Sequence, residues 1–147
     1  DILLIDSGGQ YKWGTTDVTR TTVTGKIPNN IKDNFTRVLK GHIAVFLCNI
    51  NKKFNGHLID QLARKSLKKA GLAYSHGTGH GVGHFLNVHE GPQAISKNNK
   101  IKIEDGMILS NEPGYYRKGK FGIRIENLIY AIKIISIIQI LPLSIAL

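Results

Sequence analysis

The chain has 147 residues, 41% of them hydrophobic, which is enough for one domain with a hydrophobic core and argues against disorder. Its 20 basic and 10 acidic side chains give a formal net charge of +10, and a single cysteine, Cys48, excludes an internal disulfide and zinc modules built on cysteines. The lysines are spread out and no aromatic residues interleave with the two Lys-Lys pairs. We therefore interpret the charge as a solvated basic surface and expect no nucleic-acid partner.

The first 24 residues favour a β-hairpin that carries two carboxylates. The apolar run 2–5 ends at Asp6 and is followed by Ser7-Gly8-Gly9, which predicts a buried strand with a turn directly after the carboxylate. After a second turn signal at Trp13-Gly14, residues 15–24 are rich in β-branched side chains, and alternation places Asp17 and Thr19 on the same face. If the two runs pair as antiparallel strands, Asp6 and Asp17 can face each other across them.

Two helices are expected next, followed by a strand-rich remainder. Apolar residues at helical spacing predict a helix over 31–49, capped by Asn29 or Asn30, and a second over 57–70 that ends at Gly71. We expect both to cover a sheet. The apolar tail 129–147 is interrupted by polar residues and proline and falls short of the roughly 20 apolar residues of a membrane span, so its isoleucines favour buried strands.

Residues 76–89 contain four histidines among alternating glycines. Glycine at every second position favours an extended segment or tight turn over a helix, and alternation would place His76, His80 and His84 on one face. The pair His89-Glu90 begins a zinc-protease helix signature, but position 93 is Gln. The spacing alone does not select the histidine that would bind metal.

Two further carboxylates follow in short apolar runs. Glu112 stands just before Pro113-Gly114, so a strand is expected to end there with the carboxylate at its edge. In residues 122–130, alternation sends Arg124 and Glu126 to one face, where the arginine can orient a neighbouring acidic group. Four carboxylates with an imidazole are a ligand set for a pair of hard divalent ions, which points to hydrolysis.

Four segments carry a family resemblance: DILLIDSGGQYKWGTTDVTRT (1–21), HGTGHGVGHFLNVHEGP (76–92), ILSNEPGYY (108–116) and GIRIENLIY (122–130). Together they resemble the pita-bread metallopeptidases, most closely the aminopeptidase P (Xaa-Pro aminopeptidase) family. The resemblance implies an α+β fold of the creatinase/aminopeptidase type, present here in incomplete form, with a curved, mostly antiparallel sheet covered by helices. It further implies that residues 1–147 are the C-terminal part of the catalytic domain, family-like to about residue 130 and divergent over 131–147.

The resemblance also implies roles for individual residues. It implies a bridging hydroxide between two divalent ions, expected to be manganese, which attacks peptides that have proline in second position. Glu112 would also carry the proton, His76 and His89 would contact the substrate and stabilise the charge on its carbonyl, and Arg124 is counted with this catalytic group. His84 matches no functional position. The implied metal ligands are Asp6, Asp17, His80, Glu112 and Glu126.

Some alternatives share these features. Prolidases and methionine aminopeptidases of the same fold use similar ligands, and non-catalytic pita-bread domains bind proteins or nucleic acid. We expect a cytoplasmic location, because the N-terminus lacks a secretory signal, and no membrane partner. We also expect the isolated chain to be inactive unless a complementary upstream fragment or a second copy completes it, since open strand edges would otherwise be exposed.

Overall fold

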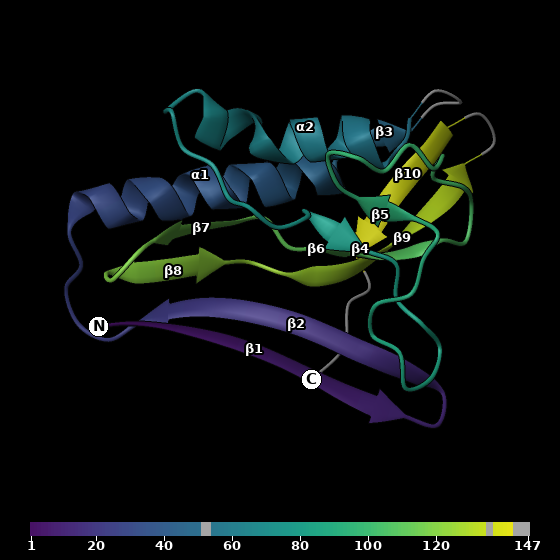
Figure 1. Ribbon diagram of the computed structural model, residues 1–147, viewed down its shortest axis with the longest axis horizontal. Helices are drawn as coiled ribbons and strands as arrows, with labels where there is room; N and C mark the ends of the chain where they lie inside the picture. Colours follow the sequence, from purple (N-terminus) through teal and green to yellow (C-terminus); the bar gives the residue numbers. More distant parts are fainter. Residues whose placement is uncertain (51–53, 135–136, 143–147) are drawn as a thin grey trace.

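Two helices cover one face of a group of short antiparallel strands in this computed structural model, and a long hairpin lies beyond the strands, away from the helices (Figure 1). The structure describes residues 1–50, 54–134 and 137–142. In chain order the elements are β1 (Ile2–Tyr11), β2 (Gly14–Val23), α1 (Asn29–Phe46), β3 (Asn49–Ile50), α2 (Gly56–Lys68), β4 (Gly79–His80), β5 (Ala94–Ile95), β6 (Ile108–Asn111), β7 (Gly114–Arg117), β8 (Phe121–Arg124), β9 (Asn127–Ile134) and β10 (Ile137–Pro142).

All strand pairings among the described residues are antiparallel. The largest sheet has the order β3-β10-β9-β6, and β1-β2, β4-β5 and β7-β8 form two-stranded pairs. Isolated backbone bridges join Thr19 to Glu126 and Gly81 to Leu109, which connects the hairpin and the segment after β4 to this sheet. The predicted antiparallel arrangement with helical cover is confirmed.

The β1-β2 hairpin and its turn signal at Trp13-Gly14 are confirmed, but the turn predicted at Ser7-Gly8-Gly9 is wrong. The first strand is also not buried as predicted, because Leu3 and Ile5 are exposed. β1 runs straight through Ser7-Gly8-Gly9 and reverses only at Lys12-Trp13, because its ladder to β2 continues unbroken to the Tyr11–Gly14 pair. Asp6 therefore lies in mid-strand. It stands opposite Thr19 rather than Asp17, so the two carboxylates are diagonal neighbours on one face instead of direct partners.

Both helices occur where the sequence predicts them, with shifted ends. α1 begins at Asn29 directly after Pro28, whose carbonyl accepts from the N–H groups of Ile31 and Lys32, so neither asparagine is its N-cap as predicted. α2 is capped by the side chain of Asn55, whose Oδ1 accepts from the N–H of Leu58 at 3.1 Å. The helix ends at Lys68, and Gly71 follows with φ +68°, a conformation that favours glycine.

The core lies between the helices and the strands in two clusters of buried side chains. The first contains Val45, Cys48, Ile59, Ala63, Ile95, Ile103, Leu109, Ile129 and Ala131, and the second contains Val38, Leu67, Tyr74 and Ile123. Cys48 belongs to the first cluster, and burial raises the pKa of its thiol to about 11, so the lone cysteine is a packing residue.

The apolar tail forms strands where it is described. β9 pairs with β6 and β10, and Ile129 and Ala131 are buried. Residues 143–147 lie outside the described part. Over the described residues, no helix is long and apolar enough to cross a membrane.

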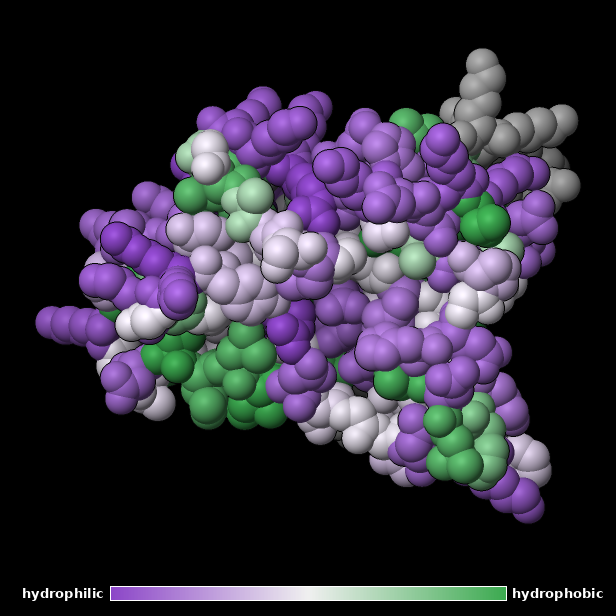
Figure 2. Space-filling view, in the orientation of Figure 1, coloured by the Kyte–Doolittle hydropathy of each residue, from purple (hydrophilic) through white to green (hydrophobic). Residues whose placement is uncertain are grey.

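The visible surface is mostly hydrophilic over α1 and α2, with hydrophobic patches over the hairpin side (Figure 2). Exposed apolar side chains on that side include Leu3 and Ile5 of β1, and Phe85 and Leu86 of the loop that follows β4. The hydrophilic helical face agrees with a solvated basic surface.

The two helices touch closely at Gly41, and this contact generates a stability prediction. A Cβ atom at position 41 would lie 2.3 Å from the backbone oxygen of Ala63 in α2. We expect Gly41→Ala to destabilise the chain by about 1–3 kcal/mol through overpacking, although alanine is the better helix former by about 1 kcal/mol. Urea unfolding measures this difference. The exposed Lys40→Ala change in the same helix is the control and should be nearly neutral. A stabilised Gly41→Ala chain would contradict the close contact.

Candidate metal centre

The hairpin presents two carboxylates on the same face. Asp17 of β2 is only 9% exposed, and Asp6 of β1 is exposed. Thr19, two residues beyond Asp17 on the same face, is fully buried and donates its hydroxyl to Glu126 Oε2 at 2.5 Å. The alternation predicted from sequence thus places the side chains of Asp17 and Thr19 toward one site.

His80 is brought to this face by a very short strand. Gly79, just before it, packs so closely on β6 that a Cβ atom would lie 2.0 Å from the Ser110 backbone oxygen. A Cβ atom at Gly81 would similarly lie 1.9 Å from the Glu90 oxygen. These glycines therefore allow the chain to approach its own backbone rather than a ligand, and the predicted single extended face for His76, His80 and His84 is wrong because only Gly79–His80 is a strand.

The ring of His80 is oriented as a metal ligand requires. Its Nδ1 lies 2.9 Å from the Gly81 carbonyl oxygen, which can only accept, so Nδ1 carries the proton in the neutral ring. Its Nε2 is then left 3.3 Å from Asp17 Oδ2 and 3.3 Å from Glu112 Oε1. A backbone carbonyl that fixes the tautomer in this way is a common support for metal-binding histidines.

Two glutamates complete the cluster. Glu112 follows the last residue of β6, as predicted, and its Oε1 accepts from the Ser110 hydroxyl at 2.8 Å. The same hydroxyl oxygen accepts from the backbone N–H of His80 at 3.0 Å, so Ser110 is hydrogen-bonded to both His80 and Glu112. Glu126 lies between β8 and β9 and is only 2% exposed.

Crowding and burial shift the titration of these groups. Burial raises the pKa of Glu126 to about 7, and the negative charges of Glu112, Asp17 and Asp6 add to this. Burial also raises the pKa of Glu112. Burial alone would lower the pKa of His80, but its hydrogen bonds and the nearby carboxylates raise it overall. The site therefore carries more negative charge than its own cations neutralise.

The donor set fits a divalent cation. One ligand atom each from Asp17, His80 and Glu126 lie within 4.8 Å of one another. A cavity of about 350 Å³ opens on this triad, and its lining also includes Asp6, Glu112 and His89. Carboxylate oxygens with one imidazole match the preference of hard hydrolytic metal ions. The structure thus brings all five predicted ligand residues to one cavity, three of them within one ligand cluster.

Arg124 holds the exposed member of the cluster. Its guanidinium forms an ion pair with Asp6 Oδ2 at 2.5 Å and donates to the hydroxyls of Thr19 at 3.2 Å and Tyr116 at 2.9 Å. The prediction that Arg124 and Glu126 share a face and that the arginine orients a neighbouring acidic group agrees with these contacts.

The two histidines expected to contact substrate lie in different places. His89 lines the metal cavity, with its ring centroid 4.1 Å from that of His80. His76 does not line it. The Nε2 of His76 bonds the Tyr116 hydroxyl at 2.9 Å and its Nδ1 lies 2.7 Å from the Gly77 oxygen. His84 is exposed, which agrees with its lack of a predicted role.

Sequence reasoning missed Ser110 and Thr19, which bond the predicted ligands, and Tyr116, which bonds His76 and Arg124. For Thr19 the signal was present, because alternation placed it beside Asp17. Ser110 is two residues before Glu112 on a strand and would share its face by the same argument. Nothing in the spacing indicates Tyr116.

The chain is closely similar to known peptidases in sequence. The family model for "Metallopeptidase family M24" matches residues 1–133. Xaa-Pro aminopeptidase 1 of Dictyostelium discoideum is 56% identical over 127 residues, covering 84% of this chain and 20% of that protein. Aminopeptidase P2 of Arabidopsis thaliana is 53% identical over 131 residues, covering 88% of this chain and 18% of that protein. The chain therefore spans about a fifth of the length of these curated relatives.

Solved structures agree with the sequence match. An X-prolyl aminopeptidase from Caenorhabditis elegans, described as a cytosolic enzyme with a di-nuclear active site, has a TM-score of 0.91 and 40% identity, covering 99% of this chain and 24% of that one. A prolidase from Thermococcus sibiricus has a TM-score of 0.85 and 32% identity, covering 99% and 38%. The predicted pita-bread fold is thereby confirmed, and the chain belongs to metallopeptidase family M24.

Proposed function

We propose that this chain is the metal-binding part of an aminopeptidase that releases the first residue from peptides with proline in second position. The observation that carries the proposal is the convergence of Asp17, His80 and Glu126 within 4.8 Å, with Asp6 and Glu112 lining the same cavity. The substrate class is supported by the names of the curated relatives, which are Xaa-Pro aminopeptidases at more than half identity. Because the chain matches about a fifth of those proteins, its place as the C-terminal part of the catalytic domain, with a divergent tail over 131–147, stays a prediction.

The proposed cofactor is a pair of divalent ions, with manganese as the expected metal. Asp6, Asp17, His80, Glu112 and Glu126 would hold them. When bound, such ions act as Lewis acids that lower the pKa of a water molecule and polarise a carbonyl group. The donor set of four carboxylates and one imidazole supports this choice over a thiolate-rich zinc site.

The chain's own residues would supply the remaining chemistry. Glu112 would take the proton of the attacking water and pass it to the leaving nitrogen, a role that suits a carboxylate whose pKa is raised. His89, exposed at the cavity, would donate a hydrogen bond to the carbonyl oxygen as negative charge develops there. His76 would do so only by exchanging its bond to Tyr116 for one to the substrate. Arg124 would keep Asp6 in place.

Two other functions are specific enough to test. Prolidases appear among the similar solved structures, which favours a dipeptide substrate as the second candidate. A non-catalytic pita-bread binding module is the third. The complete carboxylate set argues against it, because such a module has no physical need for buried acidic groups that converge. The cytoplasmic location and a complementary fragment or second copy as partner stay predictions.

A peptide comparison tests the substrate class. We expect Xaa-Pro-Xaa tripeptides to be cleaved in Mn²⁺ at least about tenfold faster than Xaa-Pro dipeptides or Met-Ala peptides, a difference of about 1.4 kcal/mol in transition-state stabilisation. This difference is expected when the chain is assayed with an upstream fragment of a relative, by chromatography of the released residue, whereas the chain assayed alone is expected to be inactive. Glu112→Gln is the inactive control. Cleavage of the dipeptides alone would replace this proposal by a prolidase.

A matched histidine pair tests the metal site. His80→Ala removes the imidazole whose Nε2 faces Asp17 and Glu112, and we expect the Mn²⁺ affinity to fall by more than about 100-fold, beyond the 10–100-fold typical of a lost supporting residue. His84→Ala, in the same glycine-rich segment but exposed, should leave the affinity unchanged. Titration calorimetry measures both. A wild-type chain that stays folded and empty in excess Mn²⁺ would favour the binding module.

The buried glutamate predicts a pH dependence of stability without metal. Burial raises the pKa of Glu126 from 4.5 to about 7, so between these pH values the folded chain keeps a proton that the unfolded chain releases. The Glu126 contribution is thus complete below pH 4.5 and is lost as the pH rises through 7, by up to about 3 kcal/mol at about 1.4 kcal/mol per pKa unit. Chelated samples are unfolded in urea across this range.

This measurement compares substitutions of two glutamates, one buried and one exposed. Glu126→Gln should flatten the fall in stability, whereas Glu104→Gln, at an exposed carboxylate, should leave the wild-type pH dependence in place. An unchanged pH dependence in Glu126→Gln would refute the raised pKa as its source.

A further inference from the structure

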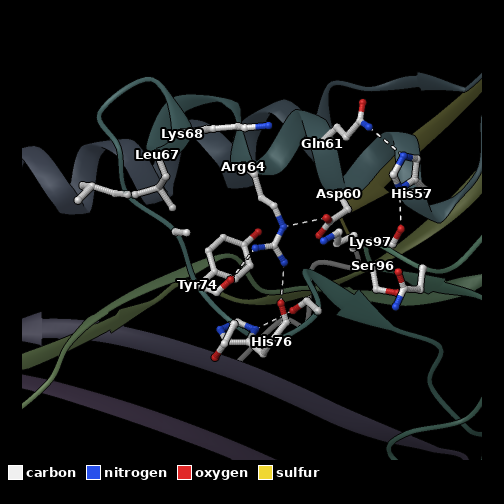
Figure 3. A pocket seen from close by; sticks show the side chains of 15 residues that line it. His57, Asp60, Gln61, Arg64, Leu67, Lys68, Tyr74, His76, Ser96 and Lys97 are labelled. Atoms are coloured by element: carbon white, nitrogen blue, oxygen red, sulfur yellow. Dashed lines mark hydrogen bonds and ion pairs between the residues drawn. The ribbon is translucent and has the colours of Figure 1, made fainter.

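A second cavity, of about 650 Å³, lies on the helical side of the segment that carries His76. It opens between α2 and the residues around 72–77 and 96–98 (Figure 3). Its lining includes the cations Arg64, Lys68 and Lys97, which at first suggests an anion site. Figure 3 shows instead that Arg64 points inward to protein groups, while the other two are exposed surface lysines.

The guanidinium of Arg64 donates hydrogen bonds to two backbone carbonyls and one carboxylate. Its Nη1 donates to the backbone oxygen of Tyr74 at 2.7 Å, and its Nη2 donates to the backbone oxygen of His76 at 2.6 Å. Its Nε donates to Asp60 Oδ2 at 2.7 Å, one turn earlier in α2. The guanidinium also lies over the Tyr74 ring, 3.8 Å from its centroid. A planar guanidinium, whose N–H donors point in fixed directions, is needed to bond all of these groups at once.

Asp60 extends the same contacts to Thr78. Asp60 is only 2% exposed, and its Oδ1 accepts from the fully buried Thr78 hydroxyl at 2.5 Å. That hydroxyl in turn bonds the Tyr74 hydroxyl at 2.5 Å. A buried polar network of this kind is rigid when all its members are paired.

Thr78 connects this network to the candidate metal centre. Its backbone oxygen accepts from the N–H of Glu112 at 2.8 Å, and its N–H donates to Ile95 at 2.8 Å. It stands midway between His76 and His80 in the chain. Any displacement of Thr78 would therefore move both imidazoles and the start of the Glu112 side chain.

We propose that Asp60 and Arg64 are positioning residues for the metal centre: from the back of the segment 74–78 they fix the placement of His80 and Glu112. Neither residue touches the cavity that the five predicted ligands line. A simple stabilising pair on a helix would need only the Arg64–Asp60 contact. The two carbonyl contacts and the Thr78 bond are what make the pair specific to this segment. The metal-affinity part of the proposal rests on the proposed function.

Three variants of α2 test the positioning role. Arg64→Gln removes the charge and the fork, and Arg64→Lys keeps the charge but cannot reach both carbonyls. Lys68→Gln is the matched control, because Lys68 lines the same cavity and its ammonium has no hydrogen-bond or ion-pair partner in the described part of the chain. Each variant is checked for helical circular dichroism, and Arg64→Lys carries the test if Arg64→Gln unfolds.

Two measurements are made on each variant. Calorimetry with Mn²⁺ should show an affinity at least about tenfold lower for Arg64→Gln, the lower end of the range for lost supporting residues, and no change for Lys68→Gln. Hydrogen exchange of the metal-free chain follows the amides of Thr78, His80 and Gly81, which are hydrogen-bonded here. We expect at least about tenfold faster exchange at these three amides with α1 unchanged, the pattern of local rather than global opening.

The outcomes separate the two proposals. A wild-type chain that binds no Mn²⁺ would defeat the proposed function, and the exchange data would still decide the positioning role. Exchange and affinity both within twofold of the wild type in a folded Arg64 variant would overturn that role. Faster exchange everywhere, including α1, would also overturn it, because it would show general stabilisation only.

Discussion

The site depends on the burial of several carboxylates against one another. Asp17 and Glu126 are almost without solvent exposure, and Glu112 is half-buried beside them. Like charges in such a setting cannot all ionise without cationic compensation. Without metal, burial above all, with the negative charges of Glu112, Asp17 and Asp6 beside it, raises the pKa of Glu126 to about 7. The electrostatic cost of burying these like charges together favours a proton on Glu126, and it would favour a bound divalent cation more strongly. The cluster is therefore an unfavourable arrangement for a purely structural role.

The neighbours of the carboxylates restrict their geometry without neutralising them fully. Thr19 donates to Glu126, Ser110 donates to Glu112, and Arg124 pairs with Asp6, so one oxygen of each of these three carboxylates is held by the protein. Two of these partners are neutral hydroxyls. They orient a carboxylate while leaving its charge available, which is the property a metal ligand needs. The single strong cation, Arg124, acts on the most exposed acid.

The sequence predicted the elements well where one local pattern decided them. Alternation and helical spacing located the hairpin, both helices and the strand before Glu112. These patterns failed where contacts between separate segments determine the structure. The ladder between β1 and β2 keeps Ser7-Gly8-Gly9 in the strand, and Gly79 and Gly81 are needed for close contacts with distant backbone. The five residues proposed as ligands could be named from the sequence because dense motifs that resemble a known family mark them, although the spacing alone did not select His80 among the histidines. The group that supports them from α2, Arg64, could not be named in this way, since its hydrogen-bond partners are carbonyl oxygens of Tyr74 and His76, which every residue possesses.

The net charge of +10 is compatible with an acidic metal site because exposed lysines of the helical side lie away from it, although Arg124 pairs with Asp6 within it. Exposed lysines 65, 68 and 69 lie on or just after α2, on the helical side of the strands, whereas Asp6 and Asp17 lie on the hairpin beyond them (Figure 1). At physiological ionic strength, exposed charges farther apart than about 8 Å interact weakly. A metal ion or a peptide ammonium at the cavity therefore experiences chiefly the local carboxylates. Exposed lysines of the helical surface, unlike Arg64 with its contacts to the segment 74–78, can thus change without weakening the site, which is why overall charge is a poor guide to the function of this chain.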